Sequence, residues 1–173
     1  MKRKQIVRRV AFVGIMGAVA VALSFFESLI PAIPGLPPGA KPGLSNIVTM
    51  FLASSAGIAD AFFITVLKGL FAGITRGATA MFMSLSGGIL STTAACIIFR
   101  SKKIKFGYIG TAIICAVCHN IGQLITACVI SGTPSLIWGY GPLLLIFAVV
   151  TGCITGAILR AVLPALKKIY KRS

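Results

Sequence analysis

Six apolar runs, separated by short polar turns, make up most of the 173 residues and leave little of the chain to face water. The runs cover residues 10–30, 44–57, 58–74, 78–99, 107–130 and 140–163. Most of them approach the roughly 20 residues with which an α-helix crosses the hydrocarbon core of a bilayer. Charged residues are 11% of the chain, whereas about 25% is typical of soluble domains. The pattern predicts an all-α polytopic transmembrane bundle of about six helices, forming a single integral membrane domain over residues 1–173.

The second and third runs are short for a full crossing, at 14 and 17 residues. Such helices can tilt, thin the bilayer around them, or lie partly buried in protein. The segment between the first two runs, residues 31–43, contains five prolines and three glycines and cannot continue a helix. We expect a long loop there, on the outer side of the membrane, where it could act as a lid.

The net charge of +15 reflects the position of the chain in a membrane rather than nucleic-acid binding. The basic residues gather in clusters beside apolar runs, and no nucleic-acid-binding motif accompanies them. Cytoplasmic loops of membrane proteins carry such an excess of Lys and Arg, and these charges can also meet anionic lipid head groups. We therefore predict a multi-pass protein with both termini in the cytoplasm. The clusters are Lys2, Arg3, Lys4, Arg8 and Arg9, then Arg100, Lys102, Lys103 and Lys105, then Arg160, Lys167, Lys168, Lys171 and Arg172.

Glu27 and Lys68 are charged residues inside apolar runs. A charge at the bilayer centre costs about 3 kcal/mol on insertion scales, so such side chains usually face a cavity or a partner. Glu27 and Lys68 could pair with each other, extend to an interface, or line a functional cavity. Asp60 is the second of two acidic residues, and we interpret it as a helix N-cap or a turn residue.

The fifth run contains a polar group formed by His119, Asn120 and Gln123. Helical spacing places His119 and Gln123 on one face, with Asn120 beside them. In lipid these side chains either form hydrogen bonds between helices or line a ligand site. Basic and amide residues near the predicted outer ends of the second and third runs would make that site cationic, and suited to an anionic or carbonyl-bearing ligand that enters from outside. These additional residues are Lys41, Asn46 and Arg76.

Cofactor and metal chemistry find little support in the sequence. Cys115, Cys118 and His119 match the C-x-x-C-H pattern of haem attachment, but they lie inside an apolar run that the attachment machinery cannot reach. No Gly-x-x-x-x-Gly-Lys motif is present, so the chain is not itself an ATPase. Prenyl diphosphate chemistry normally uses several carboxylates to hold Mg²⁺, and two acidic residues cannot supply them. We expect no cofactor, no metal site and no catalytic residues.

The first run carries small residues at four-residue spacing, Gly14, Ala18 and Ala22. Such a stripe permits close approach of another transmembrane helix. It is compatible with docking on a membrane partner.

Five motifs are spread along the chain: Glu27-Ser28, Lys41 to Asn46, Ser86-Gly87-Gly88, His119 to Gln123, and Gly152 to Gly156. Together they resemble the bacterial Gx transporter family, which is often labelled heptaprenyl diphosphate synthase component I. The resemblance implies a protein of the bacterial cell membrane, similar to the S components of energy-coupling-factor transporters. Those six-helix proteins bind a small substrate beneath the loop after the first helix, and dock through small residues of that helix on a membrane coupling subunit driven by ATPases.

The first functional hypothesis is an S-component-like membrane protein that binds or transports a small ligand, which the family label links to isoprenoids or quinones. Its ligand-binding residues would be Lys41, Asn46, Lys68, His119, Asn120 and Gln123, with Glu27 pairing a cation or gating. The alternative is a non-catalytic membrane subunit of heptaprenyl diphosphate synthesis or of a quinone- or flavin-linked electron-transfer complex. The shortage of carboxylates disfavours an enzyme in its own right.

Overall fold

Backbone N–H and C=O groups in the core of a bilayer have no water to bond with, and an α-helix satisfies them with its own hydrogen bonds. The computed structural model of the protein is helical, as this rule requires. It describes residues 2–30, 43–101 and 106–172. These parts form six helices and contain no strand, which confirms the predicted all-α fold. The helices are α1 (Lys2–Leu29), α2 (Asn46–Ser55), α3 (Ile58–Arg76), α4 (Ala78–Arg100), α5 (Tyr108–Ser131) and α6 (Leu136–Arg172).

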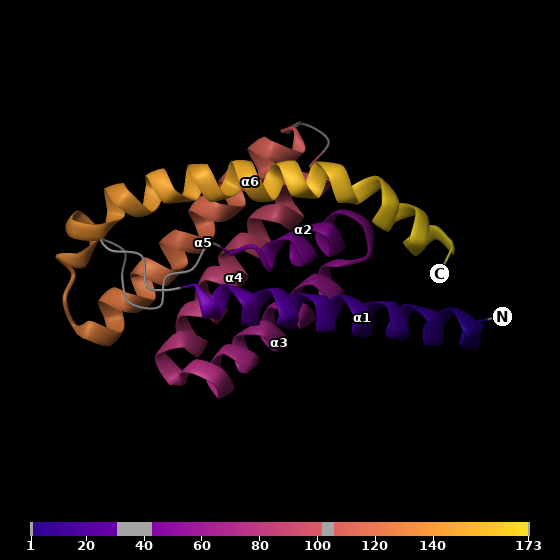
Figure 1. Cartoon of the computed structure of the whole chain (residues 1–173), viewed down its shortest axis with the longest axis horizontal. Coiled ribbons are helices and arrows are strands. Elements are labelled where there is room, and N and C mark those ends of the chain that lie inside the picture. The colour runs from indigo at the N-terminus through magenta and orange to yellow at the C-terminus, as the bar shows by residue number, and fades with distance from the viewer. Residues whose placement is uncertain (1, 31–42, 102–105, 173) are drawn as a thin grey trace.

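The first and last helices extend well beyond the apolar runs from which they were predicted. Helix α1 begins within the first basic cluster, and α6 ends within the last one. Lys and Arg have high helix propensity, so the helix continues where the apolar pattern stops. Both termini lie at the same end of the molecule, and α1 leaves that end while α6 returns to it (Figure 1). This arrangement agrees with an N-terminus and a C-terminus on one side of a membrane.

Five of the six helices are long and apolar enough to cross a membrane, and α2 is the exception. Its 10 residues rise about 15 Å, which is about half of a hydrocarbon core of roughly 30 Å. Residues Asn46 through Ala53 are all buried inside the bundle. Protein rather than lipid therefore surrounds most of the second apolar run, so this run can be shorter than a membrane crossing. It does not complete a crossing by itself.

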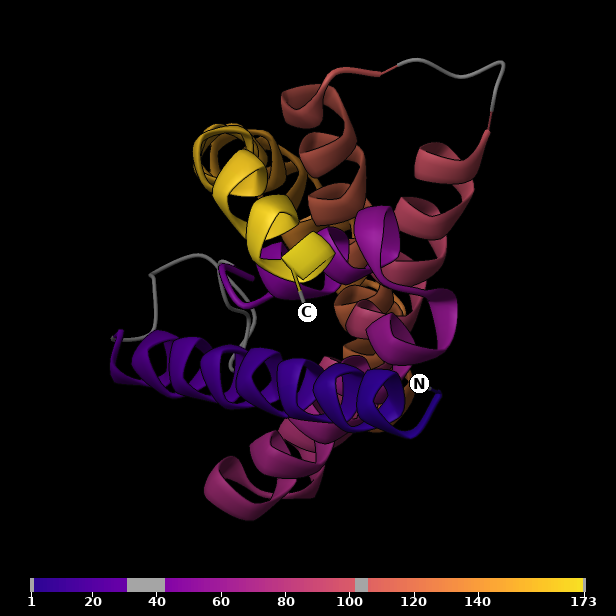
Figure 2. The same cartoon turned by 90° about the vertical axis from the view of Figure 1, so that its right-hand side faces the viewer.

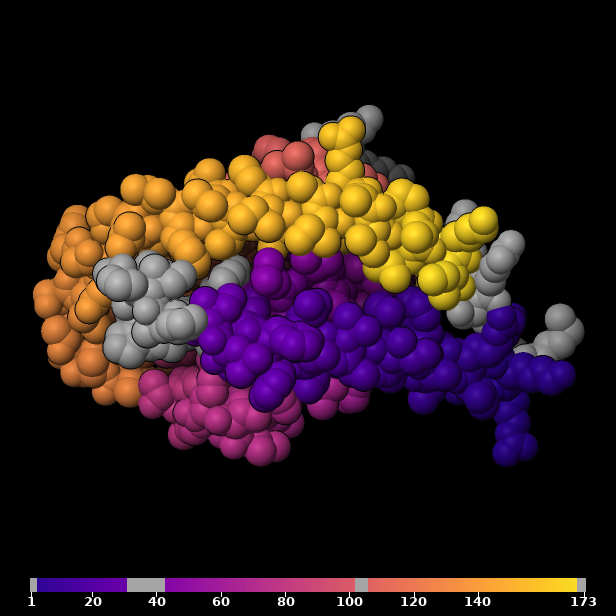
Figure 3. Space-filling view, in the orientation of Figure 1, coloured from indigo at the N-terminus to yellow at the C-terminus, as the bar shows by residue number. Residues whose placement is uncertain are grey.

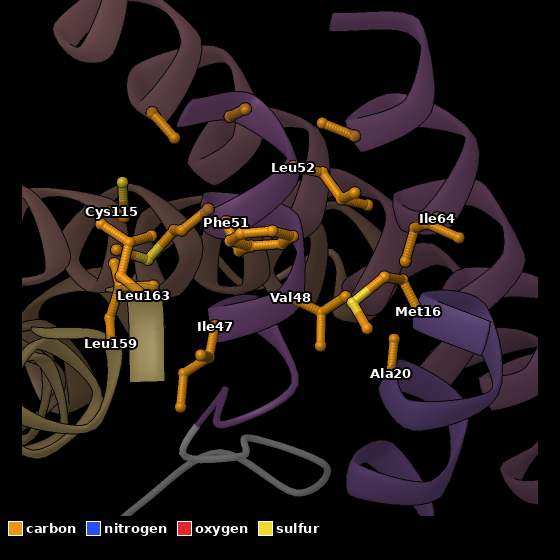
Figure 4. Packing of buried hydrophobic residues seen from close by; sticks show 14 of the residues in the cluster. Met16, Ala20, Ile47, Val48, Phe51, Leu52, Ile64, Cys115, Leu159 and Leu163 are labelled. Atoms are coloured by element: carbon orange, nitrogen blue, oxygen red, sulfur yellow. The ribbon is translucent and has the colours of Figure 1, made fainter. Parts of the chain in front are cut away.

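Helix α2 lies in the centre of the core. Its Phe51 and Leu52 are fully buried, and in Figure 4 they lie between α1, which contributes Met16, and α6, which contributes Leu159. Viewed from the end that carries the termini, α1 crosses below α6 (Figure 2). Helix α1 also forms much of the front surface in the space-filling view (Figure 3). A half-length helix inside longer ones brings its polar N-terminal turn into the interior of the bundle.

Asp60 connects α3 to α1. The N-cap of α3 is Gly57, and Asp60 lies in the first turn of the helix, so it is not the cap residue that one sequence interpretation proposed. A carboxylate in the first turn interacts favourably with the positive end of the helix dipole. Its Oδ2 also accepts a hydrogen bond of 2.8 Å from Arg9 Nη2. The pair links the two helices near the end of the molecule that carries the termini.

Candidate functional site

A small polar cavity lies between α1, α3, α4 and α5 and the turn that precedes α2. Its volume is about 20 Å³, which is room for roughly one water molecule. The polar side chains that line it combine one carboxylate, two cations, hydroxyls and an imidazole–amide pair. They are Ser24, Glu27, Ser45, Lys68, Arg76, Ser84, His119 and Gln123.

Glu27 holds the N-terminal turn of α2. The side chain is 4% exposed. One carboxylate oxygen, Oε1, accepts hydrogen bonds from the backbone N–H groups of Leu44 and Ser45, and the other, Oε2, accepts one of 3.2 Å from Ser45 Oγ. The first N–H groups of a helix lack partners within the helix, and a carboxylate stabilises them. Glu27 therefore links the C-terminal part of α1 to the start of the buried helix.

Gly43 shapes the same turn. Its φ of 76° lies in the left-handed region, and a Cβ atom there would come within 2.8 Å of Asn46 Nδ2. A glycine is needed for both reasons. The turn therefore directs Asn46 into the interior.

Lys68 donates a hydrogen bond of 2.7 Å from Nζ to Asn46 Oδ1. The lysine is 4% exposed and the asparagine 6%. A carboxamide is neutral, so this contact leaves the positive charge of Lys68 in the site. Lys68 and Glu27 line the same cavity.

His119 and Gln123 contact each other on one face of α5. Gln123 Nε2 donates to His119 Nε2 at 3.1 Å. His119 Nδ1 lies against the backbone of Gly87, and both this atom and Gln123 Oε1 are buried without a hydrogen bond of normal geometry to a described residue. Buried polar atoms are usually satisfied, so His119 and Gln123 keep unused hydrogen-bonding capacity beside the cavity.

Two facing glycines bring His119 against α4. A Cβ on Gly122 would lie 2.7 Å from Gly87 Cα, and a Cβ on Gly87 would lie 2.7 Å from the backbone oxygen of His119. The helices can therefore approach this closely only because both residues lack side chains. The crossing holds the imidazole at the cavity wall.

Asn120 faces a different neighbour from His119 and Gln123. Its Nδ2 donates to the backbone oxygen of Leu144 in α6 at 3.0 Å, and it does not line the polar cavity. Arg76 does line it, although the sequence interpretation counted it only as a nearby outer charge. Lys41, another predicted site residue, lies outside the described residues.

The small residues of α1 remain on its outer face. Gly14, Ala18 and Ala22 are all exposed, and a Cβ on Gly14 would meet nothing within 4 Å. The helix packs inward through other positions, among them Met16 and Ala20. The stripe is therefore not used to pack α1 against its own bundle.

Replacing Glu27 with glutamine should lower the thermal stability of the purified protein. The amide has one acceptor oxygen where the carboxylate has two, and it lacks the charge that favours a helix N-terminus, so we expect a loss of about 1–3 kcal/mol. Asp60→Asn is the matched control, because it changes the only other acidic residue, which pairs with the exposed Arg9. An effect of Asp60→Asn equal to that of Glu27→Gln, measured by thermal unfolding in detergent, would contradict this role of Glu27.

Comparison with known proteins identifies one family. A family model described as heptaprenyl diphosphate synthase component I matches residues 16–162. No curated protein and no solved structure matches the chain. The matched segment contains α2 to α5 completely, together with α1 from residue 16 onward and α6 up to residue 162. It includes all the polar residues of the cavity.

Proposed function

We propose that this chain, which belongs to the heptaprenyl diphosphate synthase component I family, is a membrane protein with a small ligand bound in the polar cavity. The observation that carries this proposal is the pair of buried, unsatisfied polar atoms on His119 and Gln123. His119 and Gln123 line a cavity whose other polar walls include charged side chains. Buried polar groups without partners are uncommon in folded proteins, and charged side chains inside a membrane bundle usually face a cavity or a partner.

The charges of the cavity favour a ligand with a negative group. Lys68 and Arg76 bring two positive charges, and the single carboxylate, Glu27, already accepts hydrogen bonds from the start of α2. A carboxylate, phosphate or strongly polarised carbonyl oxygen would accept hydrogen bonds from the lysine and arginine. The cavity holds only about one water-sized group, so one polar group of the ligand would enter it in the form described here.

The role that fits this site is that of an S-component-like binding or transport protein. We propose a bacterial cell membrane as its location, with the basic ends of α1 and α6 in the cytoplasm and the whole chain as one domain. In this orientation the cavity lies in the outer half of the bundle. The exposed Gly14, Ala18 and Ala22 would pack against a membrane coupling subunit that works with ATPases. The family description names heptaprenyl diphosphate, which is an isoprenoid, and we propose a ligand related to isoprenoids or quinones.

A second candidate function is that of a non-catalytic membrane subunit. The words "component I" in the family description favour it, since a component implies a partner subunit. The partner would then carry out heptaprenyl diphosphate synthesis or a quinone- or flavin-linked electron transfer. In that case the polar cavity would hold water or a structural lipid group rather than a transported molecule.

Native mass spectrometry of the protein extracted from its own membrane distinguishes these functions. The binding proposal predicts one small molecule for each chain, which is retained at mild activation and carries an acidic or carbonyl group. The subunit alternative predicts a stoichiometric protein partner with synthase or redox activity and no small-molecule adduct. That second spectrum, obtained from a sample with the wild-type thermal stability, would refute the binding proposal.

A further inference from the structure

A second cavity opens on the opposite face of α5 from the polar site. We call it the α5–α6 slot, and its volume is about 300 Å³, at the lower end of the range for small-molecule pockets. Several of its wall residues, including Ile121, Ile125, Ile137 and Leu145, are substantially exposed on the outside of the bundle. The lining is Asn120, Ile121, Leu124, Ile125, Ile137, Gly141, Leu144 and Leu145.

The local sequence of α6 explains why the slot exists. Gly139 and Gly141 have no side chains, and Pro142 interrupts the backbone hydrogen bonding of the helix. A Cβ on Gly141 would meet Leu124 Cδ2 at 3.8 Å, which is ordinary van der Waals contact. Space therefore remains where a larger residue at position 141 would fill the gap between the helices. The lateral opening is built into the sequence of α6.

One polar side chain lies in this apolar lining. Asn120 is 5% exposed, and among the described residues its one hydrogen bond runs from Nδ2 to Leu144 O. Its Oδ1 is left able to accept a hydrogen bond. A carboxamide in an otherwise aliphatic pocket orients a ligand, whereas the apolar walls supply the binding area. The slot therefore suits a hydrocarbon chain that carries a polar end with a donor, such as a hydroxyl.

We propose that the α5–α6 slot binds the chain of an isoprenoid lipid, with the polar end of that lipid at Asn120. A slot walled by exposed isoleucine and leucine side chains would open to the bilayer, so its occupant can enter from the membrane without crossing water. The choice of an isoprenoid over a straight acyl chain rests on the proposed function. The existence of the slot does not depend on the proposed function, because the slot shares no lining residue with the polar cavity.

The two sites are neighbours in sequence and separate in space. His119 and Gln123 line the polar cavity, whereas Asn120 and Leu124, each one position further along, line the slot. Successive residues of a helix point about 100° apart. Helix α5 therefore separates a polar site on one face from a lipid-facing site on the other, and each can be altered without the other.

Photolabelling tests the slot directly. The protein is reconstituted in phosphatidylcholine nanodiscs with a geranylgeraniol analogue that carries a diazirine, and labelled residues are identified by mass spectrometry. We expect labelling concentrated on Ile121, Ile125 and Leu145. Unlabelled geranylgeraniol should compete with the probe, whereas oleyl alcohol should compete at least about tenfold less well. Labelling spread evenly over lipid-facing residues of other helices, such as Val66 and Ile97, would overturn the proposal.

Paired variants separate slot binding from a general effect on the fold. Gly141→Leu fills the slot and should reduce labelling about tenfold, equivalent to ~1.4 kcal/mol. Gly139→Leu makes the same change where a Cβ meets nothing within 4 Å, and it should leave labelling unchanged. Should Gly141→Leu fail to fold, Ile125→Trp narrows the opening from its exposed side, with Val129→Trp as the control. Equal labelling within each folded pair would overturn the proposal.

The outcome of the labelling experiment does not depend on the polar cavity. Lys68→Met should leave labelling of the slot unchanged, because Lys68 does not line it. A sample without any small-molecule adduct in the polar cavity, but with competed labelling in the slot, would refute the proposed function and support the slot. Equal competition by oleyl alcohol would indicate a site for ordinary lipid chains and overturn the isoprenoid assignment.

Discussion

Lys68→Met is expected to lower the affinity for the co-purifying acidic ligand by about 100-fold, equivalent to ~2.8 kcal/mol. The ammonium group lies in the cavity, is 4% exposed and has Asn46 Oδ1 as its neutral partner. Loss of a buried, charged hydrogen bond to a ligand typically costs about 2–5 kcal/mol. The measurement is the fraction of protein that retains the ligand in native mass spectrometry, over a series of ligand concentrations.

The thermal stability of the purified protein should fall by about 1–3 kcal/mol, because Lys68→Met leaves the buried Asn46 Oδ1 without its hydrogen-bond donor. Methionine has a similar volume, so the substitution creates no large void. Lys168→Met, on the exposed part of α6, removes the same charge far from the cavity and should change neither property. Full retention of the ligand by a folded Lys68→Met protein would exclude Lys68 from the site.

Gly87→Ala is expected to destabilise the protein by about 1–3 kcal/mol, the usual cost of overpacking. The new methyl group would lie 2.7 Å from the backbone oxygen of His119 and 2.9 Å from its Nδ1. The backbone of α5 cannot avoid the new methyl group by a change of rotamer, as a flexible side chain could, so α4 and α5 must move apart. The imidazole would move with α5, and ligand retention should fall together with the unfolding temperature in detergent.

Gly14→Ala is the matched control for this substitution. Both changes add one methyl group and gain about 1 kcal/mol of helix propensity, but a Cβ on Gly14 meets nothing within 4 Å. We expect the stability of the isolated protein to stay constant or rise. A decrease as large as that of Gly87→Ala would show that the close approach of α4 and α5 is not the cause.

The membrane character of the chain was predictable because it depends on composition along the chain. Five long apolar helices and the helical bundle were confirmed, and the family suggested by the sequence motifs is the one whose model matches. The extent of α1 and α6 was underestimated, because apolarity marks the bilayer and not the end of a helix. The basic residues Lys4 and Lys168 continue helices beyond it.

The set of residues that line the polar cavity was less predictable than the helices around it. His119, Gln123, Lys68 and Glu27 were selected from the sequence, and all four line one cavity. Asn120, which shares their polarity, faces α6. No sequence signal separated it from His119, since the two are adjacent polar residues in one apolar run and Gln123 lies about one helical turn from both.

The sequence by itself determined that the chain belongs in a membrane, where its helices lie and which few polar residues had to be accommodated. Only the tertiary structure decided that α2 is enclosed by the other helices, that Glu27 holds its first turn, and that α5 separates a polar cavity from an apolar slot. The physical reason is that lipid is as apolar as the interior of a helical bundle. A helix in this setting carries no apolar stripe that marks its inward face, so the faces are assigned only by close packing and by the pairing of the rare polar groups.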